Sequence, residues 1–195
     1  MQFLALCLLV APVAYTLAAP DPTTICLPEK STMRVFGLIR KIQANVSSDF
    51  SQNKIAEVTE LERRVLDLNT NYSYAIDPTG ACTRQRLPVP GIITRCLPPS
   101  TVFLGTVFEG FVNKVSLNGW LIPVNQDINV TLLTYTEPGQ SDSYFVLRRD
   151  DTSWGQRISF VSNPVASIAD TSVFNVPAVC PDKPLEVRLN VFKYM

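Results

Sequence analysis

The residues best able to carry chemistry in this chain are its cysteines. Outside the apolar N-terminal run, which contains Cys7, there are four: Cys26, Cys82, Cys96 and Cys180. An even number behind a secretory leader predicts two disulfides and an oxidising compartment, and the residues by themselves leave three pairings open. The sequence contains no histidine, so the commonest general base and the commonest metal ligand are missing. This combination favours a secreted binding or matrix protein over an enzyme.

Catalytic and metal sites of the common kinds are not predicted. Ser-His and Cys-His pairs need a histidine, and no local motif brings two carboxylates together as in a glycosidase. The cysteines lack C-x-x-C spacing, which disfavours zinc. The acidic group near a predicted turn is Asp150-Asp151 with Asp142. Calcium needs about six to eight converging oxygens, so we interpret this group as a solvated turn.

The first 18 residues have the pattern of a signal peptide. The run 3–14 is almost wholly apolar, and Thr16-Leu17-Ala18 ends in the small-x-small pattern that signal peptidase accepts. The alternative is a membrane anchor, but the run is shorter than the roughly 20 residues that span a bilayer. We predict cleavage after Ala18, secretion to the extracellular space, no membrane span, and one domain over residues 19–195.

Charge excludes a nucleic-acid binder. The chain has 17 Lys and Arg against 17 Asp and Glu, and phosphate binding needs a basic surplus. Its hydrophobic content of 46% is that of a globular protein. Three Asn-x-Ser/Thr sequons fit a secreted chain, and we predict glycosylation at Asn45, Asn71 and Asn129.

The remaining pattern is one of short strands separated by proline and polar turns. Strands are predicted over 33–42, 72–76, 102–111, 115–122, 128–135, 144–149, 158–161 and 185–194. Residues 54–68 have apolar spacing that also fits a helix, but their neighbours favour two strands or one bent strand. Turns are predicted at 47–49, 77–80 and 137–139, a turn or bulge at Asn118-Gly119, and an irregular crossing at 87–99. This succession predicts an all-β sandwich or a strongly curved sheet.

Three segments of the chain match patterns of a known family. They are Phe50-Ser51-Gln52-Asn53-Lys54, Tyr74-Ala75-Ile76-Asp77 running to Cys82, and Ser172-Val173-Phe174-Asn175-Val176-Pro177-Ala178-Val179-Cys180. Together they resemble ependymin and the ependymin-related proteins, in the same order and over nearly the whole chain after the leader. The last segment is similar to the family's Asp-Pro-x-Val-Phe-x-Pro-Pro-x-Cys pattern. It departs from that pattern at Thr171 and Val176, which replace prolines, and in its cysteine, which comes one residue late.

The resemblance implies an all-β fold of two stacked, curved antiparallel sheets that enclose an apolar pocket, similar to bacterial lipoprotein carriers. It implies secretion, glycosylation, a homodimer and binding of a lipid or fatty acid, and relatives are reported to associate with calcium and to act in cell adhesion. It also implies a Cys82–Cys180 disulfide, and with it a second disulfide between Cys26 and Cys96. A family cysteine in the region of 135–138 is absent here, and Cys96 is present in the proline-rich crossing instead.

A pocket of this kind would be lined by inward apolar side chains of several strands. The candidates are Phe36, Leu38, Trp120, Ile122, Leu132, Phe145, Leu147 and Phe160. The alternative is that these residues form a close-packed core without a cavity.

We therefore predict a secreted, glycosylated protein that is not an enzyme and that binds a hydrophobic ligand in a β-sheet pocket as a homodimer. Burial of apolar ligand surface would drive binding, at roughly 25 cal/mol per Å² before ordering costs. The alternative function is that of an extracellular matrix or cell-adhesion protein, associated with calcium, whose sheet surface contacts other proteins. A third alternative is a carrier of a small non-lipid molecule.

Overall fold

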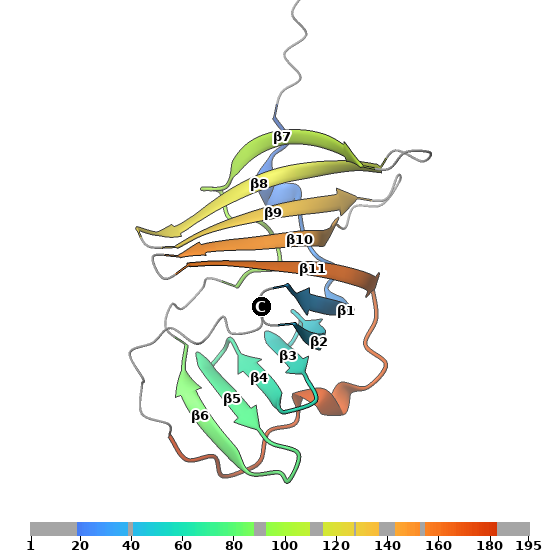
Figure 1. The fold of residues 1–195 in the computed structure, drawn as a ribbon. Coiled ribbons are helices and arrows are strands. Elements are labelled where there is room, and N and C mark those ends of the chain that lie inside the picture. The colour runs from blue at the N-terminus through green and yellow to red at the C-terminus, as the bar shows by residue number, and fades with distance from the viewer. Residues whose placement is uncertain are drawn as a thin grey trace, which may run out of the picture.

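The structure, a computed structural model, describes residues 19–38, 41–87, 93–109, 115–126, 128–136, 143–152 and 155–182. In this part of the chain eleven strands form one antiparallel sheet (Figure 1). The strands are β1 (Lys30–Gly37), β2 (Ile42–Asp49), β3 (Lys54–Val58), β4 (Arg63–Asp67), β5 (Tyr72–Ile76), β6 (Cys82–Arg86), β7 (Val102–Glu109), β8 (Val115–Asn125), β9 (Ile128–Thr136), β10 (Ser143–Thr152) and β11 (Gly155–Val165). Two short 3-10 helices, η1 (Pro22–Thr24) and η2 (Thr171–Phe174), precede and follow the sheet.

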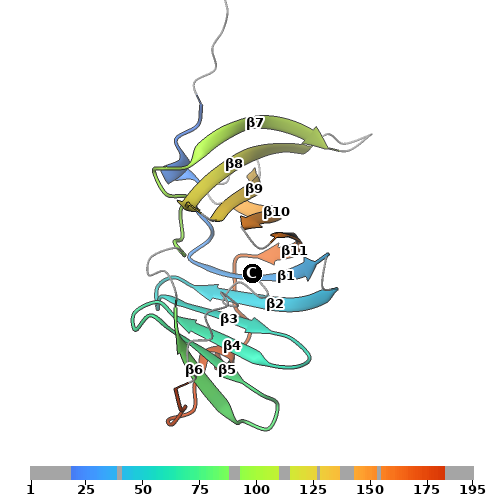
Figure 2. The same ribbon diagram turned by 60° about the vertical axis from the view of Figure 1, so that its left-hand side comes forward.

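The sheet consists of two meanders joined edge to edge. The strand order is β6-β5-β4-β3-β2-β1-β11-β10-β9-β8-β7, so consecutive strands pair within β1–β6 and within β7–β11. The meanders join where β1 pairs with β11, as in the pair Phe36 and Phe160. Figures 1 and 2 show the sheet as strongly curved, with β6 and β7 at its two edges.

The all-β class and the curved antiparallel architecture are confirmed. The two expected sheets correspond to the two meanders, but the described strands form a single open sheet instead of two separate layers. The physical reason is the β1–β11 pairing, which extends from Thr32 to Gly37 and gives the backbone groups of both strands their partners.

Most predicted strands are confirmed. Residues 54–68 form the hairpin β3–β4, and β9 and β10 pair as a hairpin. The turn at 77–80 is closed by the Gly80 amide, which donates to the Asp77 carbonyl at 3.0 Å, and Gly80 has φ of 90°. Asn118-Gly119 lies inside β8, opposite a bulge between Phe103 and Gly105 of β7. The leader, the turn at 137–139 and the strand at 185–194 lie outside the described residues.

The prediction for residues 33–49 is confirmed for 33–37, which lie in β1, and wrong for the end of that strand and for the turn at 47–49. Two strands occupy this region, and the chain reverses between Leu38 and Lys41, which has φ of 51°. The residues 47–49, predicted as a turn, are buried and end strand β2. Their turn-like character has a local cause, because the Asp49 carboxylate caps the next turn by accepting from the Ser51 amide at 3.1 Å.

Cross-strand pairs define two faces of this sheet. We call the face that carries Met33, Val46, Leu66 and Trp120 the core face. Buried apolar side chains form two clusters on it, one over β1–β4 and one over β8 and β9, and Phe145 of β10 contacts both. The N-terminal segment and the crossing after β6 cover this face with Leu27, Leu87 and Leu97, which are buried in the two clusters.

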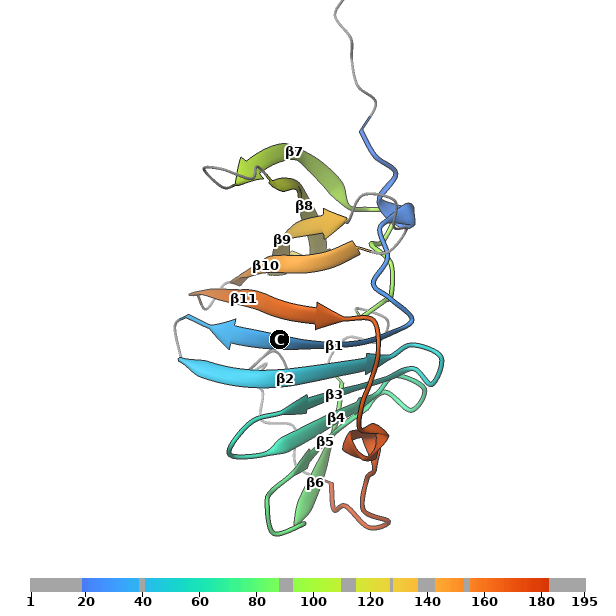
Figure 3. The ribbon, with the colours of Figure 1, turned by 90° about the vertical axis from the view of Figure 1, so that its right-hand side faces the viewer.

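On the opposite face, the C-terminal segment 166–182 covers β3–β6 (Figure 3). Phe174 of η2 is 4% exposed and packs in a third cluster with Ala56, Val65 and Ile76. Over β1 and β11 the same face leaves Phe36 and Phe160 39% and 42% exposed. The opposite face is therefore closed over one half of the sheet and exposed over part of the other.

Hydrogen bonds from Arg63 and a disulfide help to hold the C-terminal segment. The Arg63 guanidinium nitrogen Nη1 donates to the carbonyl oxygens of Ser172, Val173 and Asn175 at 3.2, 2.8 and 2.6 Å. The Cys82–Cys180 disulfide then fixes the segment to β6. These contacts satisfy carbonyl groups of an irregular segment that has no ladder of its own.

Candidate ligand-binding site

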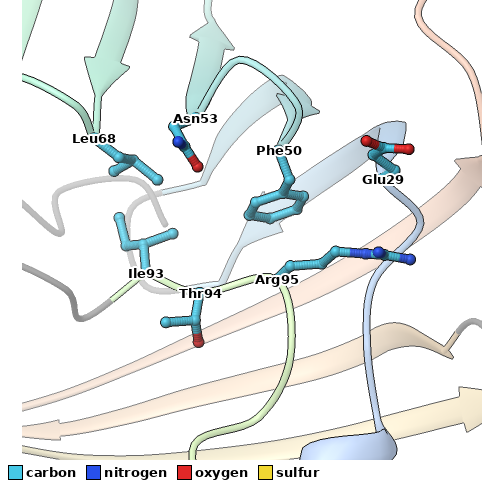
Figure 4. Close-up of a pocket in the computed structure, with 7 residues that line it drawn as sticks. All are labelled: Glu29, Phe50, Asn53, Leu68, Ile93, Thr94 and Arg95. Carbon is cyan, nitrogen blue, oxygen red and sulfur yellow. The ribbon is translucent and has the colours of Figure 1, made fainter.

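A cavity of about 340 Å³ lies at the end of the sheet that carries the β2–β3 and β4–β5 turns. Its lining comes from four segments of the chain, as Figure 4 shows: Glu29, Phe50, Asn53, Leu68, Ile93, Thr94 and Arg95. Phe50, Leu68 and Ile93 are half-buried and pack against the core cluster over β1–β4. The other four residues are polar and exposed. The cavity thus has an apolar floor continuous with the core and a polar rim.

The turn after β2 positions Phe50. The Phe50 amide donates to the Glu29 carbonyl at 2.9 Å, and buried Asp49 holds the following residues by accepting from the Ser51 and Gln52 amides at 3.1 and 3.3 Å. Burial acts to raise the pKa of the Asp49 carboxyl. Hydrogen bonds from Ser51 and Gln52 and the charge of Lys30, 3.5 Å away, outweigh burial and hold that pKa below its usual value.

Asparagine side chains join the two turns at the cavity. Asn53 Nδ2 donates to Asn69 Oδ1 at 2.9 Å, and Asn69 Nδ2 donates to the Gln52 carbonyl at 3.0 Å. The Leu68 amide donates to the Asn53 carbonyl at 2.9 Å. Asn53 has φ of 53°, a left-handed conformation that asparagine tolerates better than most residues. The position of Leu68 against Phe50 therefore depends on a network that spans two hairpins.

The remaining wall is an irregular segment tied to the N-terminal segment. The Leu27 amide donates to the Arg95 carbonyl at 2.9 Å, and the Leu97 amide donates to the Ile25 carbonyl at 3.0 Å. The Cys26–Cys96 disulfide lies between these two hydrogen bonds. Arg95 also donates through Nε to the Leu27 carbonyl at 2.8 Å, and its side chain lies on the same side of the cavity as Glu29 (Figure 4).

The eight predicted pocket residues do not line this cavity. Four of them lie together on the core face, in or against the cluster over β8 and β9: Trp120, Ile122, Leu132 and Phe145. Trp120 is fully buried, and its Nε1 donates to Thr134 Oγ1 at 2.9 Å. Its ring centroid is 5.0 Å from that of Phe103. Leu132 is buried in the same cluster, and Ile122 and Phe145 are partly buried and pack against it.

The other predicted pocket residues lie elsewhere. Phe36, Phe160 and Leu147 form one cross-strand row on the opposite face of β1, β11 and β10. Leu38 follows β1 and is 53% exposed. Phe145 and Leu147 point to different faces although they are two residues apart, because the register of β10 against β9 shifts between them.

The cysteines pair as Cys26–Cys96 and Cys82–Cys180, with Cα–Cα separations of 3.9 and 5.2 Å. These are the pairings that the resemblance implies. Among the sequon asparagines, Asn45 on β2 and Asn129 on β9 are exposed. Asn71 is half-buried in the β4–β5 turn with φ of 58°.

The acidic pair is structural in character. Asp150 and Asp151 lie inside β10 and not in a turn, so their side chains point to opposite faces of the sheet. Each accepts from the arginine two residues earlier, Asp150 from Arg148 at 2.8 Å and Asp151 from Arg149 at 3.0 Å. Asp142 lies outside the described residues, and among the described ones there is no group of three or more residues able to hold a metal ion.

Sequence reasoning missed the cavity residues Leu68, Ile93 and Arg95 because they lie in turns and an irregular segment. The strand pattern has no periodicity there that would mark an inward side chain. Phe50 and Asn53 did carry a signal, since they belong to the first of the three segments that resemble the ependymins.

Comparison with known proteins gives a likeness of fold. No family model and no curated protein matches the chain. An uncharacterized conserved protein from Thermus thermophilus superposes with a TM-score of 0.53 and 10% sequence identity, over 80% of this chain and 91% of that one. PNGF-II superposes over 84% of this chain and 33% of that one, with 10% sequence identity. Its TM-score of 0.44 is too low to carry an argument. The first likeness concerns the fold and not the activity.

In the part of the chain that the structure describes, no helix is long and apolar enough to cross a membrane.

Proposed function

We propose that this protein is a secreted relative of the ependymins that binds a small amphipathic ligand, of the lipid or fatty-acid class, in the cavity floored by Phe50, Leu68 and Ile93. The observation that carries the proposal is the combination of an apolar floor with a polar rim. A volume of about 340 Å³ is at the lower end of the range for ligand sites, about 300 to 1,000 Å³. It suits a medium-length acyl chain better than a whole phospholipid.

Burial of an acyl chain in this cavity would supply the free energy for binding. Each buried methylene contributes about 0.8 kcal/mol, so a chain of about eight methylenes gains roughly 6 kcal/mol before the costs of ordering. The rim offers a carboxylate, an amide, a hydroxyl and a guanidinium group, from Glu29, Asn53, Thr94 and Arg95. These groups would bind the polar head of the ligand and set its orientation.

The family part of the proposal is supported by how the resembling segments pack. Tyr74 and Ile76 of the second segment lie in one cluster with Val173 and Phe174 of the third. The first segment supplies Phe50 to the cavity. The secretory part is supported by the two disulfides, which persist in oxidising compartments, and by the exposure of Asn45 and Asn129 as glycan acceptors.

The proposal is tested by calorimetric titration of the secreted protein with decanoate. Leu68→Trp fills the cavity, and we expect it to weaken decanoate binding about tenfold or more. A tenfold loss of affinity corresponds to about 1.4 kcal/mol of binding free energy. Leu61→Trp is the matched control, because Leu61 is 76% exposed in the β3–β4 turn and its replacement leaves the affinity unchanged.

A smaller residue at the same position provides the converse test. We expect Leu68→Ala to enlarge the cavity and to shift the preference toward longer fatty acids. Equal decanoate affinity in the wild type, Leu68→Trp and Leu61→Trp, with unchanged unfolding midpoints, would overturn the proposal. Independently of these variants, native mass spectrometry of the protein from its natural source would identify any ligand that co-purifies with it.

One observation favours the alternative function of a matrix or adhesion protein. Apolar side chains remain exposed on the opposite face, among them Phe36, Leu38 and Phe160 at 39%, 53% and 42%. Exposed apolar patches of this kind mark protein contact surfaces in soluble proteins. If this surface is the functional one, Phe160→Ser would abolish binding to extracellular matrix while leaving decanoate binding intact.

A further inference from the structure

We propose that the N-glycan predicted at Asn45 lies across an exposed apolar strip of the opposite face, so that its first sugar, an N-acetylglucosamine, covers Phe36 and Phe160. The sequon predicts that Asn45 is modified, and the surroundings of Asn45 in the sheet point to what the glycan contacts. The proposal rests on that modification and is independent of the ligand site, whose cavity is lined by other residues.

The strip consists of Phe36, Phe160 and Leu147, which we call the apolar row. Phe36 of β1 pairs with Phe160 of β11, and Phe160 pairs with Leu147 of β10, so the three side chains lie next to one another across the sheet. Phe36 and Phe160 are 39% and 42% exposed, and Leu147 is half-buried. Adjoining exposed apolar side chains mark a surface that something contacts.

Asn45 lies on the same face as the apolar row, one strand beyond it. On β2 it stands directly opposite Arg34 of β1, and the next pair of side chains on this face is Gln43 and Phe36. Asn45 and Phe36 are therefore diagonal cross-strand neighbours, about 7 to 8 Å apart, a separation that long side chains span. Asn45, Gln43 and Arg34 are all exposed. A sugar attached to the Asn45 amide thus begins within reach of the Phe36 ring.

The covered part of the opposite face limits the directions in which this glycan can lie. Ser47, two residues after Asn45 on β2, is buried. Its partner on β3 is Ala56, which packs against Phe174 of the C-terminal segment. Chain therefore occupies the face on the β3 side of Asn45. The open direction for the sugar leads across β1 to the apolar row, on the strands that lie next to β2 in the sheet (Figure 3).

The chemistry of a sugar suits this surface. The face of an aromatic ring carries partial negative charge, which attracts the C–H groups on one side of a pyranose ring. Their contact also removes apolar surface from water. Arg34, exposed beside Asn45, has a guanidinium group that can donate to sugar hydroxyls. The outer hydroxyls would face water, so the glycan would turn an apolar strip into a polar surface.

Asn129 provides the contrast on the same face. It is exposed on β9 and pairs with Asp151 of β10 and Pro123 of β8. Asp151 lies four residues beyond Leu147, which places the Asn129 pair about 14 Å along the strand from the apolar row. A glycan on Asn129 should therefore lack the contact that we propose for Asn45. The two sequons form a matched pair for experiment.

Thermal unfolding of the protein secreted from eukaryotic cells tests the contact in a double-mutant cycle. We expect Asn45→Gln to lower the unfolding midpoint by about 2 to 4 °C in the wild-type background and by less than about 1 °C in the Phe36→Ser/Phe160→Ser background. The smaller shift follows because the sugar there has lost the rings that it covers. Asn129→Gln is the control, and its effect should be the same in both backgrounds.

A second measurement observes the contact directly. After trimming with an endoglycosidase that leaves the first N-acetylglucosamine on Asn45, we expect nuclear Overhauser contacts between protons of that sugar and ring protons of Phe36. The trimmed protein should keep the unfolding midpoint of the untrimmed one, because the first sugar makes the contact. Decanoate affinity should be equal in the wild type and Asn45→Gln, so this proposal and that of the ligand site succeed or fail separately.

Three results would overturn the proposal. The first is an unmodified Asn45 in mass spectra of the secreted protein. The second is an equal loss of midpoint for Asn45→Gln in both backgrounds, because the glycan would then stabilise the fold without the two phenylalanines. The third is an absence of contacts between the trimmed sugar and Phe36. If the Phe36→Ser/Phe160→Ser variant is not secreted, these contacts in the trimmed wild type decide the matter.

Discussion

In the half of the sheet formed by β1–β6, strands β3 and β4 have chain packed on both faces, whereas the half formed by β7–β11 exposes apolar side chains. In the first half the crossing segment packs on the core face and the C-terminal segment packs on the opposite face. In the second half Phe160 is 42% exposed on the opposite face, and the edge strand β7 exposes Val, Leu and Phe. The two disulfides anchor the two covering segments of the first half.

This difference suggests that the two halves of the sheet have different roles. Covering segments turn one meander into a closed core with a cavity at its end, and the N-terminal and crossing segments supply part of the cavity wall. The other meander keeps apolar surface available for contacts. Stability and ligand binding should therefore depend on the first half, and association on the second.

The largest effect should come from the disulfides. Each closes a long loop, with sequence separations of 98 for Cys82–Cys180 and 70 for Cys26–Cys96, so replacing either pair by alanines should cost about 4 to 5 kcal/mol of unfolding free energy. Urea unfolding measures this loss. The comparison becomes sharper with decanoate: the folded fraction without Cys82–Cys180 should still bind it, and the folded fraction without Cys26–Cys96 should not.

The reason for that difference is local. Cys96 follows Arg95 in the cavity wall, whereas Cys180 holds a segment on the other face of the sheet. If both double variants retain binding, the crossing segment is held in place by its hydrogen bonds without the disulfide, and our account of the cavity wall is wrong.

A pair of phenylalanines tests the two halves on the same face. Phe174, 4% exposed, packs over β3–β5, and we expect Phe174→Ala to lower the free energy of unfolding by about 3 to 5 kcal/mol. Phe160 is 42% exposed, and Phe160→Ala should cost about 1 kcal/mol or less. Chemical denaturation of the two variants measures both values. Equal losses would show that the opposite face is as well covered over β11 as over β3–β5.

A buried carboxyl in the first half predicts a pH dependence. Glu57 of β3 is 2% exposed, and its Oε1 has no hydrogen-bond partner among the described residues. Burial raises its pKa to about 7 against an ordinary value of 4.5, although the charge of Arg64 acts to lower it. The folded state therefore holds the proton more tightly than the unfolded state does. This contribution to stability is complete below pH 4.5 and is lost as the pH rises through about 7, a change of about 3 kcal/mol.

Glu57→Gln should remove that dependence, so the variant gains stability relative to the wild type at pH 8 and not at pH 4.5. Unfolding free energies at several pH values measure how steeply stability changes with pH. Glu60→Gln, at an exposed position in the β3–β4 turn, serves as the control. An unchanged slope in Glu57→Gln would mean that the carboxyl is hydrated or paired in solution.

Much of the fold could be predicted from local patterns. Alternation identifies β9, where Ile128, Val130 and Leu132 are buried, and a Pro-Gly signal identifies the turn after β5. The reversal after β1 was missed because Leu38 to Lys41 contains no glycine, proline or asparagine. The joining of the two meanders could not be predicted, since the pairing of β1 with β11 is set by contacts far apart in the sequence.

The site was harder to predict for a related reason. Alternation shows that a side chain points to one face of a strand but not which face, because that depends on the register with neighbouring strands. The bulge that separates Phe145 from Leu147 depends on β9 and has no local signal. The cavity residues Leu68 and Ile93 come from turns and an irregular crossing, whose positions are fixed by tertiary hydrogen bonds and a disulfide.

The most direct test of the central claim is a crystal structure of the protein with 10-bromodecanoic acid, located by the anomalous signal of its bromine. Our account predicts an anomalous peak between Phe50, Leu68 and Ile93, with the carboxylate at the rim near Thr94 and Arg95. A peak over Phe36 and Phe160 on the opposite face, or an empty cavity at saturating ligand, would contradict it.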